Sequence, residues 1–202
     1  MTSARETILE NLLRGRSERR EPPPYALPPF PEDPVSHFIA KARASVADVR
    51  EIAAVEEAPA VIQAILSAAG LPLRLHIPAV SPLRSLPWNS APQLEISHEA
   101  PGGADAAFSA ADYGIAETGT LAFLSGPHGP SSWHFRPGRE IVLILRPCIL
   151  PRLEDVIALL RAGGSMPATL NLVTGPSRTA DIEQTIELGA HGPCAAHILV
   201  AG

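Results

Sequence analysis

An alternation of short apolar runs with amphipathic segments, starting at Val35, constrains the fold of this chain most strongly. Two of the runs, IVLIL at residues 141–145 and HILV at residues 197–200, present apolar groups to both faces of a strand. Such a strand belongs in a sheet that is covered on both sides. Helical segments between strands of this kind favour an α/β fold. We therefore expect a single domain with a parallel or mixed sheet covered by helices.

Periodicity and glycine stops place the expected elements along the chain. Apolar residues at helical spacing predict helices over residues 35–44, 56–69, 153–162 and 179–188, the last ending at Gly189. Short apolar runs predict strands over residues 73–77, 93–97, 106–110, 120–124, 140–145, 168–173 and 196–200.

The sequence ahead of this domain predicts a helix and a proline-rich linker. Ser3 and Glu6 have the spacing of a capping box. One face of the helix then carries four apolar residues, Ile8, Leu9, Leu12 and Leu13. Its apolar stripe packs either on its own domain or on a partner subunit. The next segment holds seven prolines, which predict an extended spacer or a ligand for an aromatic groove. We divide the chain into a helix (1–15), a linker (16–34) and a domain (35–202).

Composition excludes several classes of function. The net charge of −5 argues against a nucleic-acid-binding protein. No apolar run approaches the ~20 residues of a membrane helix, and the charged N-terminal segment is unlike a secretory signal. The two cysteines, Cys148 and Cys194, lie far apart, so we expect neither an iron–sulfur cluster nor a metal site in this chain. No GxGxxG fingerprint follows a strand, and we expect no cofactor. These features together predict a cytoplasmic protein.

A first motif with chemical potential is YGIAETGTLAFL at residues 113–124. Thr118, Gly119 and Thr120 form a turn ahead of an apolar strand, and such a turn offers amides and hydroxyls to a ligand. Glu117 beside it is a candidate catalytic acid, base or orienting group. The other interpretation is a tight turn in which Glu117 caps a neighbouring backbone.

The second motif is LVTGPSRTADIEQTIELGAHGP at residues 172–193. We expect a strand, a turn at Gly175 and then a helix start, which is the geometry that binds anions in α/β proteins. Arg178 would add a planar fork for phosphate or carboxylate. Asp181 and Glu183 allow the other interpretation, in which they satisfy the helix dipole themselves. The candidate ligand-binding residues of both motifs are Thr118, Gly119, Thr120, Gly175, Ser177, Arg178, Thr179, Asp181, Glu183 and Gly192.

His191 follows the expected helix and lies near a strand end. Sites collect at strand ends in α/β sheets, which makes His191 a second catalytic candidate besides Glu117. A lone histidine in a loop is more often a structural residue. Because no metal-ligand spacing accompanies it, we expect no metal here.

Three stretches together, GIAETGTL (114–121), TGPSRTADIE (174–183) and GAHGP (189–193), resemble the LUD (lactate utilisation) domain family, in particular its C-type proteins. The resemblance implies a fold similar to CoA transferases, ribose-phosphate isomerases and formyltetrahydrofolate cyclo-ligases. It implies a role in bacterial oxidation of L-lactate to pyruvate, together with two iron–sulfur proteins. The C-type protein lacks cluster cysteines, as this chain does.

One segment departs from the family pattern. In SWHFRPGR, at residues 132–139, Arg139 stands where the family has a histidine, and His134 is a possible substitute.

Three hypotheses for function remain. The chain is the cluster-free subunit or accessory protein of a lactate-oxidising iron–sulfur system. Alternatively, it is a stand-alone enzyme or binding protein for a phosphorylated or carboxylate metabolite at residues 174–183. In the third hypothesis it is an interaction domain, whose motifs serve only turns and caps.

Overall fold

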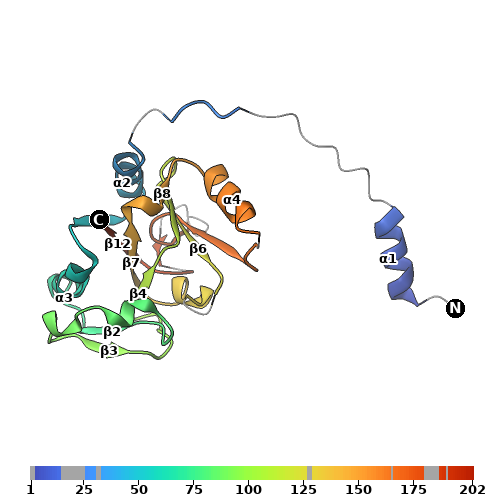
Figure 1. The fold of residues 1–202 in the computed structure, drawn as a ribbon. Coiled ribbons are helices and arrows are strands. Elements are labelled where there is room, and N and C mark those ends of the chain that lie inside the picture. The colour runs from blue at the N-terminus through green and yellow to red at the C-terminus, as the bar shows by residue number, and fades with distance from the viewer. Residues whose placement is uncertain are drawn as a thin grey trace.

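Two β-sheets form the framework of the chain in its computed structural model (Figure 1). The larger sheet has six parallel strands in the order β1-β12-β7-β4-β2-β3. Its strands are β1 (Asp48–Ile52), β12 (Ala195–Ala201), β7 (Arg139–Leu145), β4 (Ala106–Ala110), β2 (Arg74–His76) and β3 (Glu95–Ser97). The structure describes residues 3–14, 26–30, 33–126, 129–164, 166–179, 187–189 and 191–202.

The second sheet has four strands in the order β8-β5-β6-β9. These are β8 (Ile149–Leu150), β5 (Tyr113–Ile115), β6 (Thr120–Leu124) and β9 (Leu170–Val173). The β5–β8 pair is parallel, and the other two pairs are antiparallel. The helices are α1 (Ala4–Arg14), α2 (Pro34–Ala44), α3 (Ala58–Ala68) and α4 (Leu153–Ala162). Short 3-10 turns cover Val55–Glu57 (η1), Pro82–Ser85 (η2), Trp88–Ser90 (η3), Ser131–His134 (η4) and Arg146–Cys148 (η5).

The strand β7 shows why this sequence forms a sheet covered on both faces. Alternate residues of a strand point to opposite sides. Ile141 and Leu143 belong to the core that α3 covers, and Val142 and Ile144 belong to the core beneath α2 and β6. The helix α4 covers the second sheet instead. The predicted α/β architecture, with a mostly parallel central sheet, is confirmed.

Most predicted elements are confirmed within one or two residues, and α4 has the predicted bounds. The helix predicted over residues 179–188 is wrong. Arg178–Thr179 (β10) and Glu187–Leu188 (β11) are strands that pair antiparallel, and residues 180–186 lie outside the described residues. Backbone pairing explains the difference. Ser177 donates its amide to Pro193 and accepts from Gly189, so its backbone groups are held by the returning chain rather than by a helix.

The N-terminal helix α1 has the predicted capping box. The Ser3 amide donates to Glu6 Oε2 at 2.7 Å, and the Glu6 amide donates to Ser3 Oγ at 3.3 Å. None of its residues is buried, and Figure 1 shows α1 apart from the rest of the chain. Its four apolar residues are therefore exposed in this structure. Residue 15 of the predicted helix, and residues 16–25 and 31–32 of the predicted linker, lie outside the described residues.

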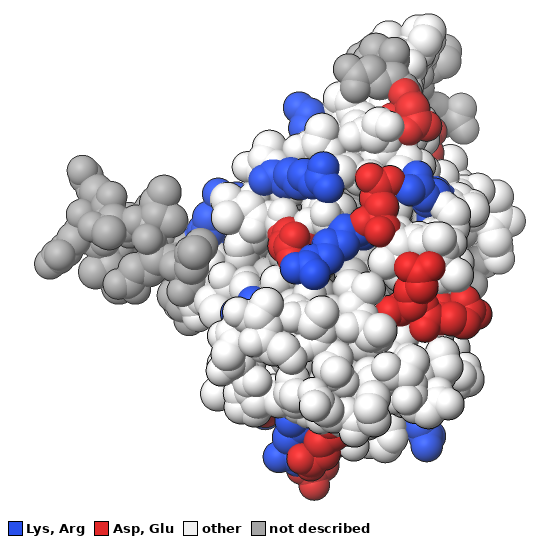
Figure 2. All heavy atoms as spheres, turned by 90° about the vertical axis from the view of Figure 1, so that its left-hand side faces the viewer, with Lys and Arg blue, Asp and Glu red and all other residues white. Residues whose placement is uncertain are grey.

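Charged residues of both signs lie among one another on the face shown in Figure 2. Half-exposed ion pairs, such as Arg50 with Asp48 and Arg146 with Glu51, place a basic and an acidic side chain next to each other. This face therefore carries no extended basic patch of the kind that follows a nucleic-acid backbone. Among the helices that the structure describes, none is long and apolar enough to cross a membrane.

Candidate functional site

The GIAETGTL motif forms the hairpin between β5 and β6. Its turn covers residues 116–119, and Gly119 has φ of 69°, the left-handed conformation that favours glycine. Glu117 lies exposed on this turn, and its backbone amide donates to the Pro151 carbonyl at 3.0 Å. Thr118 is exposed as well, whereas Thr120 is buried. The motif thus makes a defined turn and presents Glu117 to solvent.

Three threonine hydroxyls connect the first motif with the second. Thr120 Oγ1 lies 2.7 Å from Thr118 Oγ1 and 2.6 Å from Thr174 Oγ1. A hydroxyl both donates and accepts, so the three can form one chain of hydrogen bonds. The sequence left open whether the residues of both motifs bind a ligand or serve turns and caps. In this structure their hydroxyls are used to join β6 to the end of β9.

The C-terminal end of α2 occupies the space beside both motif glycines. A Cβ on Gly119 would lie 2.6 Å from the Lys41 carbonyl carbon and 2.8 Å from the Ala42 Cα. A Cβ on Gly175, which has φ of 69°, would overlap the Ser45 carbonyl oxygen. Arg178 Nη2 donates to that same oxygen at 3.3 Å. The two glycines and Arg178 therefore position α2, which favours their interpretation as structural residues.

The GAHGP motif returns the chain past the second motif. A Cβ on Gly192 would lie 3.3 Å from the Ser177 Cβ and 3.9 Å from the Phe135 carbonyl oxygen, while His191 is exposed. Arg178 and Thr179 form the strand β10 where the start of a helix was expected, so the described residues do not supply the helix start on which the predicted anion site was based. Anion binding by this motif stays a prediction. Thr179 lies in β10. Asp181 and Glu183 lie outside the described residues.

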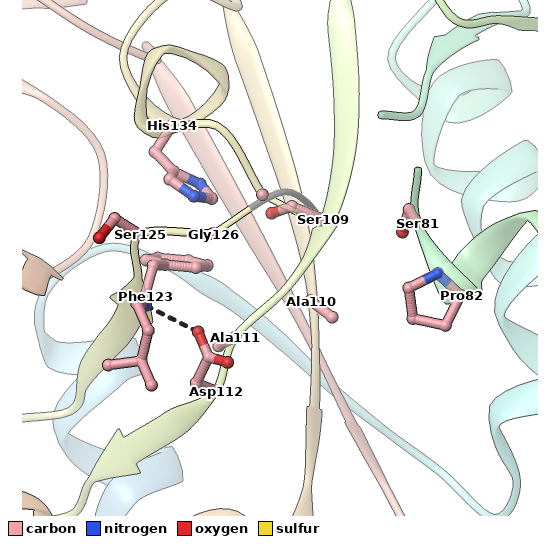
Figure 3. A pocket seen from close by; sticks show the side chains of 12 residues that line it. Ser81, Pro82, Ser109, Ala110, Ala111, Asp112, Phe123, Ser125, Gly126 and His134 are labelled. Carbon is pink, nitrogen blue, oxygen red and sulfur yellow. Dashed lines mark hydrogen bonds between the residues drawn. The ribbon is translucent and has the colours of Figure 1, made fainter. Parts of the chain in front are cut away.

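A cleft of about 300 Å³ opens at the carboxyl end of β4 (Figure 3). Its polar lining consists of Ser81, Ser109, Asp112, Ser125 and His134. These residues come from the segment after β2, the end of β4, the end of β6 and η4. Ligands of α/β sheets bind at the carboxyl ends of strands, so the position of this cleft makes it the candidate functional site.

A buried histidine–glutamate pair lies at the wall of this cleft. His134 Nδ1 is 2.7 Å from Glu140 Oε1, and each residue is 1% exposed. Ser109 Oγ approaches the same carboxylate oxygen at 3.5 Å. The Phe123 ring stacks on His134 with 3.8 Å between ring centroids. The stacking and the Glu140 hydrogen bond together hold the imidazole in one orientation.

The other ring nitrogen of His134, Nε2, is buried at the wall of the cleft. Nε2 has no hydrogen-bond partner among the described residues. When Nδ1 donates to Glu140, Nε2 of the neutral ring is an acceptor, and it becomes a donor when the ring is protonated. Burial raises the pKa of the Glu140 carboxyl, and the His134 hydrogen bond opposes that rise. Burial likewise raises the pKa of Asp112, which accepts from the Leu124 amide at 2.7 Å.

Comparison with known proteins shows the family of this chain. The model of the LUD domain family matches residues 35–201. The chain belongs to the LUD domain family. It is 35% identical over 94 residues to "Lactate utilization protein C" of Geobacillus kaustophilus, a match that covers 44% of this chain and 39% of that protein. It is 36% identical over 101 residues to the protein of the same name from Halalkalibacterium halodurans, covering 48% of this chain and 44% of that one.

Two further similarities extend this comparison. The "Uncharacterized protein YkgG" of Escherichia coli K12 is 34% identical over 94 residues, covering 45% of this chain and 41% of the relative. The matched region thus spans about two-fifths of the length of these curated relatives. A solved structure of a DUF162 family protein from Deinococcus radiodurans has a TM-score of 0.59 and 19% identity. It covers 84% of this chain and 96% of that one, and it supports the fold alone.

Arg139 of this LUD domain does not reach the His134 cleft. It lies on the opposite face of β7 from Glu140, because adjacent strand residues alternate. Arg139 Nη1 is 2.6 Å from His197 Nε2, and His197 Nδ1 is 2.9 Å from Asp48 Oδ2. Arg139 therefore joins a polar row across the amino ends of three strands. The residue beside it in sequence, Glu140, is the one that contacts His134.

Sequence reasoning considered His134 but missed Glu140, Ser109 and Asp112. A signal for Glu140 was present, since this glutamate lies in the predicted strand directly before the apolar run IVLIL. A charged group in a strand buried on both faces needs a partner or a function. The partner could not be identified from the sequence, because η4 brings His134 back onto β7 only in the fold. Within the part of the chain that is described, no cluster of three His, Cys, Asp or Glu side chains could hold a metal ion.

The raised pKa of Glu140 predicts a pH-dependent effect of the Glu140→Gln substitution. The folded pKa lies above the ordinary value of 4.5, so the folded state binds this proton more tightly than the unfolded state does. The contribution of Glu140 to stability is then fully present below pH 4.5 and is lost as the pH rises through the folded pKa. We expect E140Q to gain stability relative to wild type across that rise. Urea unfolding of both proteins between pH 4.5 and 8 tests this, and a pH-independent difference would contradict it.

Proposed function

We propose that this chain acts in bacterial use of L-lactate, as the cluster-free subunit or accessory protein of an iron–sulfur system that oxidises lactate to pyruvate. The LUD domain match over residues 35–201 carries the proposal. It is supported by curated relatives whose name is "Lactate utilization protein C". The proposal extends to a cytoplasmic location and to a fold in the superfamily of CoA transferases and ribose-phosphate isomerases.

Cysteine content supports the assignment of the clusters to partner chains. An iron–sulfur cluster is usually held by four cysteine thiolates. These 202 residues contain two cysteines, and both Cys148 and Cys194 are free thiols. In the proposed system, electrons taken from lactate therefore pass through clusters that the partners hold. The role of this chain is to bind the cluster-bearing partner chains or a small molecule.

A stand-alone enzyme or binding protein is the second candidate, favoured by the cleft beside His134. Its original basis, an anion site at residues 174–183, lost its helix start. The cleft supplies a different basis, because it combines hydroxyls, a carboxyl group and an imidazole nitrogen that has no partner among the described residues. In either candidate function, we propose that this cleft is where the small molecule binds.

Growth on lactate tests the proposed function. We expect deletion of the gene in the organism that encodes it to abolish or strongly slow growth on L-lactate, and to leave growth on pyruvate unchanged. A plasmid copy should restore growth. Affinity purification of the full chain from lactate-grown cells should also recover iron–sulfur proteins. Normal growth of the deletion strain on lactate, in the absence of a second copy, would refute the proposal.

A further inference from the structure

An apolar groove adjoins the His134 cleft at the end of β4. This groove has a volume of about 380 Å³, and the two cavities share three wall residues, Pro82, Ala110 and Ala111. Figure 3 shows Ser81 and Pro82 on one side of the cleft and Ser109 with Ala110 on the other. The shared residues make the two cavities neighbours at the carboxyl edge of the larger sheet.

The groove differs from the cleft in chemistry. It is lined by four leucines, Leu83, Leu86, Leu143 and Leu145. Leu145 is 43% exposed, although it ends a strand whose preceding residues are buried. Of the described residues that line the groove, Glu56 alone carries a charge. Such a surface gains free energy when an apolar group covers it.

The cleft suits a neutral polar group. It offers the hydroxyls of Ser81, Ser109 and Ser125. His134 at its wall is 1% exposed, and its Nε2 has no hydrogen-bond partner in the part of the chain that the structure describes. No lysine or arginine is among the described residues that line it. An anionic group would lie near the Asp112 carboxyl without a cation to offset the repulsion. A hydroxyl or carbonyl group would meet hydrogen-bonding partners at no such cost.

We propose that the cleft and the groove together form one site for an amphipathic small molecule. Its neutral hydroxyl or carbonyl head binds beside His134 and Ser109, and its apolar body covers Leu86, Leu143 and Leu145. The inference rests on the proposed function in one respect, since it uses the same cleft. It goes further by defining the class of ligand, which is neither a phosphorylated nor a purely polar molecule.

A homologous series of 1,2-alkanediols tests this proposal on the full chain. We expect the Kd, measured by NMR titration, to fall roughly two- to fourfold per added methylene, because each buried CH₂ adds to affinity. From 1,2-propanediol to 1,2-octanediol the fall should exceed about thirtyfold at this increment. At pH 7, 2-hydroxyoctanoate should bind more weakly than the octanediol. A flat dependence on chain length would overturn the proposal, and so would tighter binding of the anion.

Variants locate the site. Leu145→Ser should weaken octanediol binding at least threefold and leave propanediol binding unchanged, whereas Ser109→Ala should weaken both. The matched control is Leu172→Ser, because Leu172 is 44% exposed on β9 and does not line the groove. Equal effects of L145S and L172S would overturn the proposal.

If the double variant Leu9→Ser with Leu12→Ser bound octanediol much more tightly, the apolar face of α1 would be the occupant of the groove, and the proposal would be wrong.

Growth separates this inference from the proposed function. If diol affinity lacks chain-length dependence while the gene still restores growth on lactate, the amphipathic site is refuted and the role in lactate use stands. If chain-length dependence is found but the deletion strain grows normally on lactate, the site stands and the role in lactate use is refuted.

Discussion

Replacing Gly119 with alanine is expected to lower the free energy of unfolding by about 3–5 kcal/mol, which is large for one methyl group. Two effects add. Gly119 has φ of 69°, and an L-residue in that conformation costs roughly 1–2 kcal/mol. The new Cβ would also lie 2.6 Å from the Lys41 carbonyl carbon and 2.8 Å from the Ala42 Cα. These are backbone atoms of α2, so the helix itself would have to move, at a cost typical of overpacked cores.

The control for this prediction is Gly164→Ala. Gly164 has φ of 76°, and a Cβ there would have no heavy atom within 4 Å. We expect G164A to show only the conformational cost of roughly 1–2 kcal/mol. Equilibrium urea unfolding measures both variants against wild type. If G119A and G164A lowered the free energy of unfolding by the same amount, the close approach of α2 to the β5–β6 turn would be disproved.

Replacing His134 with leucine is expected to cost about 3–5 kcal/mol, because it leaves the Glu140 carboxylate buried without its partner. Glu140 is 1% exposed, and its hydrogen bond to His134 Nδ1 is 2.7 Å long. The double variant H134L/E140L replaces both groups with apolar side chains. We expect it to recover most of the loss, since no charge then remains buried. The double-mutant cycle thus measures the coupling directly.

An exposed ion pair provides the comparison for the buried one. Arg74 Nε lies 3.6 Å from Glu95 Oε1, with the side chains 45% and 72% exposed. Arg74→Ala should change stability by less than about 1 kcal/mol, because water screens and solvates both charges. If the losses from H134L and E140L simply added in the double variant, the two residues would not act as a pair. The cleft would then lose the orienting role assigned to Glu140.

The two motifs predicted from the sequence illustrate how far pattern alone reaches. The Thr-Gly-Thr stretch was predicted to form a turn ahead of a strand, and it does, with Gly119 in the left-handed conformation. Pattern could not reveal that α2 fills the space beside that turn. A ligand and a helix end both require a glycine for close approach, so the residue type is the same in either case.

In the segment after Gly175, by contrast, the local prediction was wrong. Acidic residues after Ser177 and apolar residues at helical spacing are typical of a helix start. The structure instead pairs Arg178 with Leu188 and Thr179 with Glu187. Local propensity differs by only a few tenths of a kcal/mol per residue, and pairing with the returning chain outweighs it here. A short stretch of sequence around β10 does not show that β11 will pair with it.

The sequence by itself determined the α/β class, the covering helices and the strands β2, β3, β4, β6, β7, β9 and β12, because burial leaves apolar runs and helical periodicity along the chain. It did not predict the strands β1, β5, β8, β10 and β11. It also determined the family, through three short motifs. The tertiary structure alone decided the candidate site. His134, Glu140 and Ser109 come from three separate elements, and only the packing of η4 against the strands β4 and β7 brings them together. Their proximity depends on long-range packing, which leaves no periodic pattern in the residues themselves.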